Sequence, residues 1–445
     1  LKKKLFECFP FMYFCCMKIA FHTLGCKLNY SETSFILKDF QNNGMKITNF
    51  SEEADIYVIN TCSVTENANK ECEQIVRKVK KISPDSIVAI MGCYAQLKPK
   101  RISEIKGVNL VIGSNEKFKL KEYLEEFKES KKNLIKVSDI KTVDNFNNAF
   151  SSEERTRSFL KIQDGCNYKC TFCTIPLARG KSRSNNIEDI IKNINKLKNN
   201  KVKEIVLTGV NIGDYGKKGE EDFYYLLKKI DKIENIRIRI SSIEPNLLSN
   251  KIIDLVTNSK TILPHFHIPL QSGSDTILKL MRRRYLTTNY AKLIKTIKTK
   301  MPHACIGADV MVGFPGETDN LFNETVDFIK SLDLSYLHVF SYSERENTPA
   351  YEFQKVVAVK ERKLRSKILR NLSNKKKNLF YLNNLNTIRP TLIEKNNKDN
   401  YLYGFTDNYI KVEVPYNKNL ENNIINVDIT KINENGNVNG KIIYN

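Results

Sequence analysis

Six of the eleven cysteines have a spacing that could hold metal. Cys166, Cys170 and Cys173 lie in one loop with the pattern C-x-x-x-C-x-x-C. Three thiolates this close together are soft ligands that suit three irons of a [4Fe–4S] cluster and leave its fourth iron open. A zinc site is disfavoured because no histidine or further cysteine lies near the loop, and bacterial ferredoxin runs use a different spacing. The loop therefore predicts an open iron–sulfur site.

Cys26, Cys62 and Cys93 form a second trio, here called the spread trio because its members lie far apart in the sequence. Each follows directly after an expected strand, and the strands are expected at 18–25, 55–60 and 86–92. Because ligands gather beyond the carboxyl ends of parallel strands, these cysteines could converge at one edge of a sheet. Glycine before Cys26 and Cys93 permits a tight turn. The alternative is that these are free cysteines that act only as small apolar side chains in the core. Three cysteines at equivalent strand ends instead favour iron–sulfur or zinc binding.

The other five cysteines are not expected to bind metal. Cys8, Cys15 and Cys16 fall in the segment 1–16, which we interpret as a mis-annotated extension before a natural start at Met17. A membrane or export signal and an ordered extension are the alternatives for this segment. Cys72, within a helical stretch, and Cys305, at the start of a strand, are expected to be structural.

Three kinds of element must position the trios. The chain from 17 to 135 alternates apolar runs with amphipathic stretches, which predicts a parallel α/β layer. A second domain, at 150–380, shows six strand–helix alternations, which predict a partial (β/α)6 barrel with its site at the carboxyl ends of the strands. Its strands are expected at 158–163, 202–208, 236–242, 262–270, 305–312 and 335–342.

The third predicted domain, at 386–445, follows a lysine-rich helix at 360–385. Its short strands are expected at 389–394, 401–406, 409–414, 424–429 and 440–444. Five short strands predict a small OB-like β-barrel, a fold that often binds oligonucleotides. The overall fold class is thus α/β with a small C-terminal barrel.

Both trios, in this order and with Phe172 before the last cysteine, resemble the radical S-adenosylmethionine (radical SAM) methylthiotransferases. The resemblance runs from Met17 to the C-terminus. It implies two [4Fe–4S] clusters and SAM as cofactors. Cys166, Cys170 and Cys173 would hold the cluster whose open iron chelates SAM, and reductive cleavage of SAM would give a 5′-deoxyadenosyl radical. Cys26, Cys62 and Cys93 would hold an auxiliary cluster that presents sulfur, and no further catalytic residue is required.

The resemblance also assigns SAM contacts at the strand ends. Thr208-Gly209-Val-Asn211 stands where the family has a Gly-Gly-Glu-like element, and Gln271-Ser272 belongs to a Leu-Gln-Ser-Gly element. Glu244 is a candidate for the SAM amino group or ribose, with a solvated strand-end carboxylate as its alternative. The expected contacts are Thr208, Gly209, Asn211, Glu244, Gln271 and Ser272.

Two further family segments follow the last two strands of the barrel. Gly313-Phe-Pro-Gly-Glu-Thr318 matches the segment that lies beside the SAM adenine. Asn347 replaces a family glycine in Tyr-Ser-x-Arg-x-Gly-Thr, and asparagine tolerates left-handed backbone angles. His265 and His267 alternate with apolar residues and are expected to be structural.

The substrate is expected from the segments 25–29, 175–183 and 208–213, which most resemble the branch acting on N6-threonylcarbamoyladenosine at tRNA position 37. Alternatives are the branch acting on isopentenyladenosine at that position, the branch acting on a ribosomal-protein aspartate, and, from another class, a noncatalytic iron–sulfur RNA-binding protein. The implied partners are a tRNA anticodon loop and a one-electron reductant.

The net charge of +22 and the last domain, which resembles a TRAM module, agree with RNA binding, although lysine-rich composition could account for part of the charge. No apolar run outside segment 1–16 reaches the roughly 18 residues of a membrane span, so no membrane partner and a cytoplasmic protein are expected.

Overall fold

The computed structural model describes residues 17–62, 66–151, 156–216, 221–398 and 400–443. The expected extension at 1–16 lies outside these residues. The chain divides into two compact units. Unit 1 comprises the residues up to Ser151 together with Asp164–Tyr168 and Cys173–Arg183, and unit 2 comprises Ser152–Gln163, Lys169–Phe172 and Ser184–Asn445. The chain crosses between the units near the short strands β8 (Gln163–Asp164) and β9 (Arg183–Ser184).

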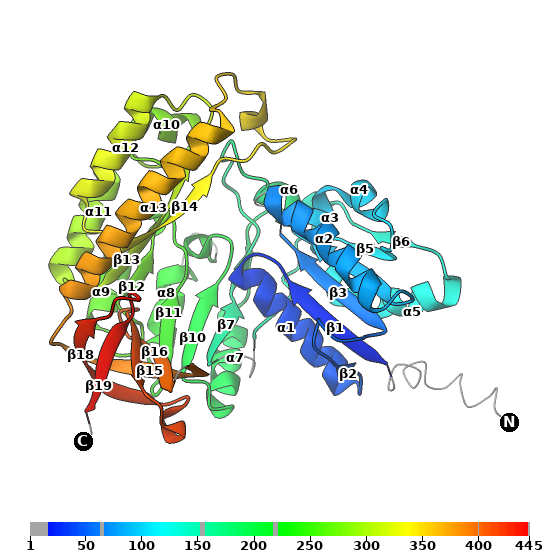
Figure 1. The fold of residues 1–445 in the computed structure, drawn as a ribbon, viewed down its shortest axis with the longest axis horizontal. Coiled ribbons are helices and arrows are strands. Elements are labelled where there is room, and N and C mark those ends of the chain that lie inside the picture. Colours follow the sequence, from blue (N-terminus) through cyan, green and yellow to red (C-terminus); the bar gives the residue numbers. More distant parts are fainter. Residues whose placement is uncertain (1–16, 63–65, 152–155, 217–220, 399, 444–445) are drawn as a thin grey trace. The chain divides into compact units, whose positions relative to one another are not determined.

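Unit 1 is built on a six-stranded sheet with the order β2-β1-β3-β4-β5-β6, in which every pairing is parallel (Figure 1). Its strands are β1 (Lys18–Thr23), β2 (Lys46–Ile47), β3 (Ile56–Thr61), β4 (Ile87–Gly92), β5 (Leu110–Ile112) and β6 (Leu134–Lys136). All residues of β3 are buried, as expected for a central strand covered on both faces. The predicted parallel layer is confirmed, with β2, β5 and β6 added to the three expected strands.

Helices cover both faces of this sheet. They are α1 (Lys27–Asn42), α2 (Glu66–Ile82), α3 (Cys93–Leu97), α4 (Pro99–Ser103) and α5 (Leu120–Ser130), and a further helix, α6 (Ile175–Arg179), packs against α3. Ile56 and Val58 of β3 pack with residues of α1 and α5, whereas Tyr57 and Ile59 pack with residues of α2. This alternation follows from the two-residue period of a strand, and it gives the layer two apolar cores.

Unit 2 contains the six parallel strands of the predicted partial barrel. They form two three-stranded sheets, with the orders β11-β10-β7 and β12-β13-β14, and single bridges at Ile238–Ile262 and Ser242–His267 connect them. The strands are β7 (Arg157–Lys161), β10 (Glu204–Thr208), β11 (Arg237–Ile240), β12 (His265–His267), β13 (Cys305–Val312) and β14 (Tyr336–Ser341). The predicted (β/α)6 architecture is therefore confirmed.

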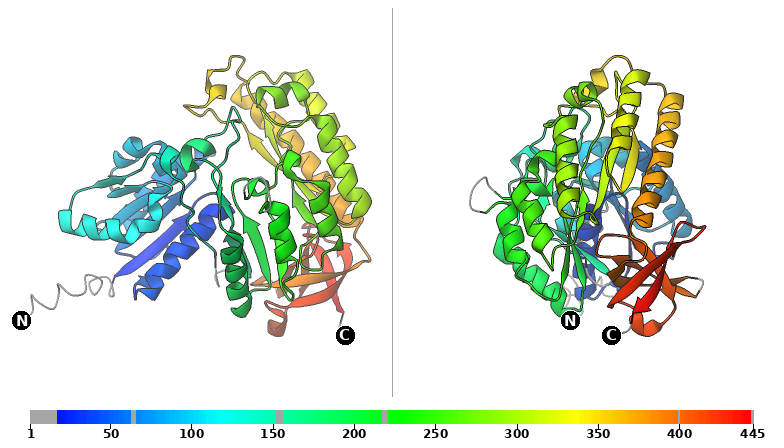
Figure 2. Two further views of the ribbon diagram at one scale, coloured as in Figure 1. Left: turned by 180° about the vertical axis from the view of Figure 1, so that it is seen from behind. Right: turned by 90° about the vertical axis from the view of Figure 1, so that its left-hand side faces the viewer.

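The helices of unit 2 lie along one side of these strands (Figure 2). They are α7 (Ile187–Asn199), α8 (Phe223–Ile230), α9 (Asn250–Asn258), α10 (Asp275–Leu280), α11 (Thr287–Lys300), α12 (Asp319–Ser331) and α13 (Val359–Leu382). Helix α7 illustrates the two local features that stabilise such helices, an N-terminal cap and one apolar face. The Asn186 side chain accepts a hydrogen bond from the Asp189 N–H at the start of the helix, and Ile187, Ile190 and Ile194 recur on one buried face.

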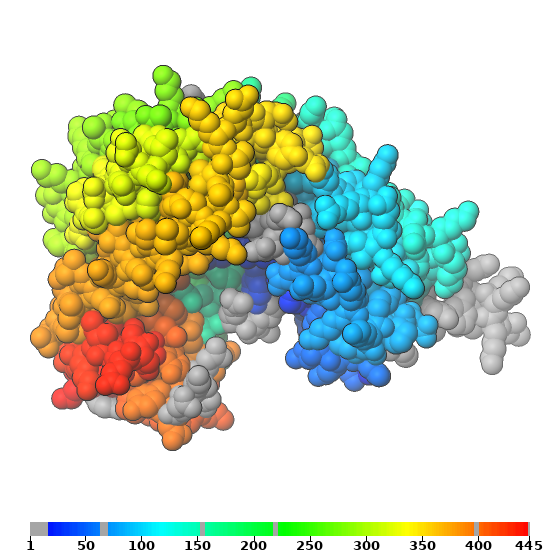
Figure 3. All heavy atoms as spheres, turned by 45° about the horizontal axis from the view of Figure 1, so that its top comes forward, coloured from blue at the N-terminus to red at the C-terminus, as the bar shows by residue number. Residues whose placement is uncertain are grey.

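Helix α13 covers the edge of β14 and leads to the C-terminal barrel. The Leu337 N–H, on the edge strand, donates to the Ser373 hydroxyl at 2.8 Å, so a helix side chain satisfies part of the open edge. Helix α13 also lies at the surface of unit 2 (Figure 3). Its residues Leu364, Leu379 and Leu382 are exposed.

The C-terminal strands close into a barrel with the order β15-β16-β17-β19-β18. They are β15 (Ile388–Lys398), β16 (Tyr401–Thr406), β17 (Lys411–Pro415), β18 (Ile424–Ile432) and β19 (Val438–Ile443). β15 pairs with both β16 and β18, which closes the barrel without an exposed edge. The predicted small barrel is confirmed.

Candidate active site

In unit 1 the three cysteines of the spread trio lie at the ends of adjacent strands. Cys26 caps α1 just after β1, Cys62 follows β3, and Cys93 is the first residue of α3 just after β4. Because β1, β3 and β4 are neighbours in a parallel sheet, their carboxyl ends share one edge. Cys62 and Cys93 are buried, whereas Cys26 is exposed.

Two glycines bring the backbone of these loops close together. Gly25 has a φ of +95° and Gly92 a φ of +99°, as their place before Cys26 and Cys93 suggested. A Cβ at Gly25 would stand 2.5 Å from the Cβ and 2.8 Å from the Sγ of Cys62. The loop of Cys26 therefore packs directly against Cys62.

Asn29 and Asn60, which were not singled out as site residues in the sequence, connect the same loops. The Asn29 Nδ2 group donates to the Leu24 carbonyl at 3.1 Å and to the Thr61 carbonyl at 2.9 Å. Asn60 Nδ2 donates to the Asn29 carbonyl at 3.1 Å. Both asparagines are fully buried, so these bonds fix the two backbones that carry Cys26 and Cys62.

Three cysteine thiols at the carboxyl ends of adjacent strands are soft ligands and fit an iron–sulfur cluster in chemical type. Among the residues that the structure describes, however, no group of three or more histidine, cysteine, aspartate or glutamate side chains has an arrangement that would hold a metal ion. The ligand roles of Cys26, Cys62 and Cys93 therefore stay predictions. Cys72 and Cys305 are both buried, as expected for structural cysteines.

The C-x-x-x-C-x-x-C loop contributes residues to both units, because Cys166 and Cys173 belong to unit 1 and Cys170 belongs to unit 2. In unit 1 the Cys166 N–H donates to the Gly180 carbonyl at 3.0 Å, and the Cys166 Sγ accepts from the Tyr168 N–H at 3.4 Å. In unit 2 the buried Cys170 Sγ accepts a hydrogen bond from Arg283 Nη1 at 3.3 Å. Cys173, in unit 1, is partly buried.

Arg283 also determines the environment of Glu244. Its Nη2 group donates to Glu244 in an ion pair, and its Nε donates to the Tyr285 hydroxyl at 3.2 Å. Burial alone would lower the pKa of Arg283, but Tyr285, Glu244 and Cys170 together raise it well above its usual value. Glu244 is thus a paired carboxylate rather than a solvated one. The run Arg282-Arg283-Arg284 was the only sequence signal for this partner.

At the end of β10, Gln163 organises the predicted SAM-binding turn. The Gln163 Oε1 accepts from the N–H groups of Val210 and Asn211, both at 2.9 Å, so these donors are already used. A Cβ at Gly209 would stand 2.8 Å from the same oxygen. The Thr208 and Asn211 side chains are buried, and neither amide atom of Asn211 has a hydrogen-bond partner among the described residues. An unsatisfied buried amide at a strand end suits a polar ligand.

Gln271 and Ser272 are positioned by hydrogen bonds to neighbouring residues of unit 2. Gln271 has a φ of +66°, and its N–H donates to the Asp309 carbonyl at 2.8 Å. The hydroxyl groups of Ser272 and Thr325 are hydrogen-bonded at 3.1 Å. None of these contacts tests the expected SAM roles, so the assignments of Thr208, Gly209, Asn211, Glu244, Gln271 and Ser272 stay predictions.

The loops after β13 and β14 are anchored from α13. Arg365 Nη1 donates to the Glu317 carboxylate at 2.7 Å, and Glu317 accepts from the Gly313 N–H at 2.6 Å. Burial raises the pKa of Glu317 despite these bonds. Asn347 has a φ of +64°, a left-handed backbone angle that asparagine tolerates, as expected.

His265 and His267, which are expected to be structural, lie on β12. The His265 ring is hydrogen-bonded to the Tyr336 hydroxyl at 3.2 Å, and the His267 ring to Asp309 at 2.9 Å.

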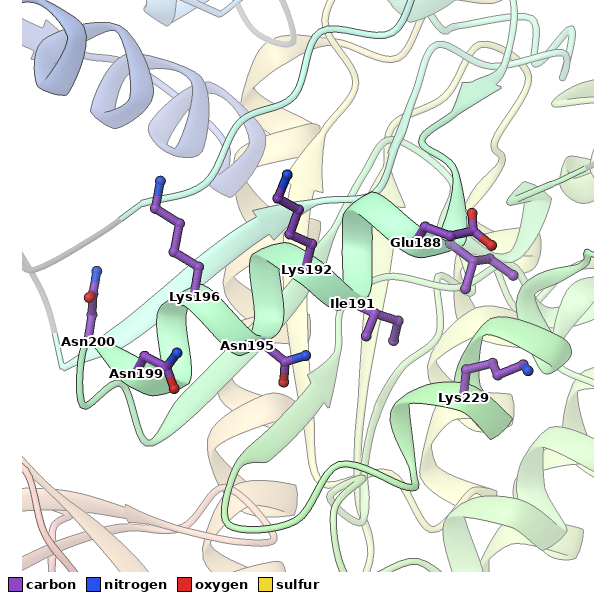
Figure 4. Close-up of a pocket in the computed structure, with 9 residues that line it drawn as sticks. Glu188, Ile191, Lys192, Asn195, Lys196, Asn199, Asn200 and Lys229 are labelled. Atoms are coloured by element: carbon purple, nitrogen blue, oxygen red, sulfur yellow. The ribbon is translucent and has the colours of Figure 1, made fainter.

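A depression of about 850 Å³ lies elsewhere in unit 2, on the outer helices (Figure 4). It is lined by α7 and by Lys229 of α8, and Lys192 and Lys196 extend from the same side of α7. These helices do not carry the strand-end residues described above. The depression is therefore separate from the candidate site.

The chain matches two family models. Residues 160–329 match the radical SAM superfamily, and residues 18–113 match an uncharacterized protein family, UPF0004. The threonylcarbamoyladenosine tRNA methylthiotransferase MtaB of Bacillus subtilis is 39% identical over 93% of this chain and 94% of its own length. The chain belongs to the radical SAM methylthiotransferases.

Other relatives of this methylthiotransferase agree. The MtaB of Aquifex aeolicus is 39% identical and covers 89% of the chain and 96% of that protein. The tRNA-2-methylthio-N(6)-dimethylallyladenosine synthase of Alkaliphilus oremlandii is 34% identical over 93% of this chain and 90% of its own length. The solved radical SAM methyltransferase TsrM of Kitasatospora setae superposes with a TM-score of 0.55 at 13% identity, covering 76% of this chain and 77% of TsrM, which shows the fold alone.

Family membership makes this protein a tRNA-modifying radical SAM enzyme that uses SAM and a [4Fe–4S] cluster. Among the described residues, no helix has the length and apolar character needed to cross a membrane.

Proposed function

We propose that this protein adds a methylthio group to C2 of N6-threonylcarbamoyladenosine at position 37 of tRNA. The observation that carries the proposal is 39% identity to the MtaB of Bacillus subtilis over nearly the whole of both chains. The MtaB proteins of Aquifex aeolicus and Rickettsia prowazekii, at 39% and 36%, also exceed the dimethylallyladenosine synthases, at 32–34%, although the MtaB of Thermotoga maritima is 29% identical. The choice of N6-threonylcarbamoyladenosine as substrate therefore rests on overall sequence identity to the MtaB proteins.

In this proposal the two cysteine trios have separate tasks. Cys166, Cys170 and Cys173 hold the cluster that binds SAM, and Cys26, Cys62 and Cys93 hold a second [4Fe–4S] cluster that presents sulfur. The cofactors supply radical cleavage of SAM, sulfur and a methyl group, and the protein supplies binding, orientation and exclusion of side reactions. A one-electron reductant must deliver the electron that starts cleavage.

Residues of unit 2 support this division of labour. Arg283 pairs with Glu244 and donates to the Cys170 Sγ, so it links a candidate SAM contact to a candidate cluster ligand. Gln163 fixes the turn after β10 and leaves the buried Asn211 amide available for a polar ligand. These groups bind and orient; none is required to move a proton.

Recognition of the tRNA anticodon loop is assigned to the C-terminal barrel, with the net charge of +22 favouring contact with phosphates. The strand order of the barrel is that of an OB-type fold, and such barrels often bind single-stranded nucleic acid. A loop presents splayed bases, which a protein can reach more readily than paired ones. The boundaries 17–135, 150–380 and 386–445 remain our proposal for the three domains.

The substrate is tested by mass spectrometry of tRNA nucleosides from a strain lacking this gene. The 2-methylthio derivative of threonylcarbamoyladenosine should disappear and return with the wild-type gene. Loss of the isopentenyl derivative instead would move the assignment to the other tRNA branch. An unchanged profile would contradict both and favour the ribosomal-protein substrate.

Catalysis is tested with the triple variant Cys166→Ala, Cys170→Ala and Cys173→Ala. Without three thiolates the SAM-binding cluster cannot form, so production of 5′-deoxyadenosine from SAM and dithionite should cease. Cys72→Ala is the matched control, because Cys72 is a buried cysteine of α2 outside both trios. Persistent 5′-deoxyadenosine in the triple variant would refute the assignment and favour a noncatalytic protein.

A further inference from the structure

Arg179 is a buried guanidinium of unit 1 that sequence analysis did not identify. It is the last residue of α6, a helix that begins two residues after Cys173, and its side chain is only 2% exposed. Nη1 donates to Glu32 and to Asp164, each at 3.0 Å. Nη2 donates to Glu32 at 2.9 Å and to the Asn29 Oδ1 at 2.6 Å.

Asn29 extends this network to the spread trio. Its Oδ1 accepts from Arg179, while its Nδ2 donates to the carbonyls of Leu24 and Thr61. Leu24 lies two residues before Cys26, and Thr61 lies directly before Cys62. One side chain thus connects Arg179 to both loops.

Cys93 is near the same guanidinium. Helix α6 packs against α3, whose first residue is Cys93. The charge of Arg179 acts on the thiols of both Cys93 and Cys26. Arg179 is therefore in contact, directly or through Asn29, with the surroundings of all three cysteines.

Two further basic side chains join this buried group. Lys117 also pairs with Glu32, and Arg183 Nη2 donates to the second oxygen of Asp164 at 3.1 Å. Lys117, Arg179 and Arg183 thus share the carboxylates of Glu32 and Asp164. All five side chains are at most 10% exposed.

We propose that Arg179 is a positioning residue for the auxiliary cluster, which fixes the loops of Cys26 and Cys62 through Asn29 and raises the cluster's reduction potential through its buried positive charge. This inference rests on the proposed auxiliary cluster. The reduced cluster carries one more negative charge than the oxidised cluster, so a nearby cation stabilises the reduced form. Arg179 would thereby influence the sulfur-presenting site from the segment that follows the SAM-cluster loop.

The test uses the full-length Cys166→Ala, Cys170→Ala, Cys173→Ala variant, in which only the auxiliary site can hold a cluster. After anaerobic reconstitution, iron content is measured, and the reduced fraction is followed by electron paramagnetic resonance in a redox titration. Arg179→Gln in this background should lower the ratio of reduced to oxidised cluster at fixed potential by about tenfold, equivalent to about 59 mV for one electron. Arg179→Lys keeps the charge and should retain the potential.

Arg179→Gln should still fold, because Glu32 keeps Lys117 and Asp164 keeps Arg183 as partners. Should it not fold, Asp164→Asn provides the opposite change. That variant removes a negative charge from the same group and should raise the reduced-to-oxidised ratio. Arg77→Gln is the matched control for loss of a positive charge, since the Arg77 side chain is 73% exposed on α2, and it should leave the ratio unchanged.

The outcomes separate this inference from the proposed function. If the background variant binds no iron, the auxiliary cluster is refuted, and the inference fails with it. If it holds a cluster whose potential is the same with Arg179→Gln as with Arg77→Gln, the inference alone is overturned. A shift in Arg179→Gln that Arg179→Lys does not show supports it.

Discussion

Gly25 is a residue at which one added carbon would disturb the predicted auxiliary site. Its φ of +95° strains any other residue, and its Cβ position lies 2.5 Å from Cys62. Gly436 offers a comparison, because it has a φ of +77° but nothing within 4 Å of its Cβ position. A substitution at Gly436 would therefore add backbone strain alone, whereas one at Gly25 would add both strain and a steric clash with Cys62.

Gly25→Ala and Gly436→Ala should each cost about 1–2 kcal/mol of stability from left-handed strain. Only Gly25→Ala should also reduce iron retention when the Cys166, Cys170 and Cys173 thiols have been removed, because Cys62 must move. Urea unfolding and iron analysis of the two variants check this. Equal iron retention in both would show that Cys62 is not confined by Gly25.

Glu204 is a second residue whose environment determines its behaviour. It is fully buried at the start of β10 and pairs with Arg239 at 2.9 Å and Arg237 at 3.0 Å. Burial would raise its pKa, but the charges of Arg239 and Arg237 outweigh burial and lower the pKa from 4.5 to about 2. The ion pairs of Glu204 with the two arginines therefore stabilise the folded protein above pH 4.5, and this stabilisation is lost as the pH falls toward 2.

Glu204→Gln should lower the free energy of unfolding at neutral pH by about 3–5 kcal/mol, because it leaves buried arginines without their carboxylate. The difference from wild type should shrink between pH 4.5 and 2, where Glu204 takes up a proton. Urea unfolding across this range measures it, with Glu234→Gln, an exposed loop substitution, as control. A deficit that does not change with pH would contradict the ion-pair explanation.

Among the elements, the turn between β16 and β17 attaches the C-terminal barrel to the rest of unit 2. The Asn408 Nδ2 group donates to the His303 carbonyl and to the Asn384 Oδ1, both at 2.9 Å. Its Oδ1 accepts from the Thr406 hydroxyl at 2.7 Å. Arg239 Nη1 also donates to the Asp407 carbonyl at 3.2 Å. The barrel is therefore anchored to the (β/α)6 strands by buried polar contacts.

Asn408→Ala should destabilise unit 2 by about 2–4 kcal/mol, since three hydrogen bonds are lost and buried partners are left unsatisfied. Differential scanning calorimetry should show a lower melting temperature. Asn419→Ala, on the exposed side of the barrel, should have little effect. An Asn408→Ala protein as stable as the Asn419→Ala protein would mean that the turn does not attach the barrel.

For the whole molecule, the net charge of +22 gives a prediction about tRNA binding. If basic side chains contact phosphates, each contact releases counterions, and affinity falls steeply with salt. Raising NaCl from 50 to 200 mM should weaken tRNA binding by about a hundredfold or more. Filter binding measures this, with SAM affinity over the same range as the reference. A tRNA affinity that does not depend on salt would assign the charge to lysine-rich composition.

Local patterns were sufficient for much of the fold. The expected strands at 305–312 and 401–406 match β13 and β16 at both ends, because their apolar runs are bounded by turn residues. Strands β2, β5 and β6 were not expected, since two or three residues are too few to show alternation. β12 is shorter than the expected 262–270.

The sequence by itself determined the two cysteine trios, their places after strands and the glycines before Cys26 and Cys93, because spacing and turn chemistry are local properties of a chain. Only the tertiary structure decided the partners of charged residues. Arg179 meets Glu32 across 147 positions, and Arg283 meets Glu244 across 39. Such pairs depend on which side chains are buried together, and burial follows from packing of the whole chain.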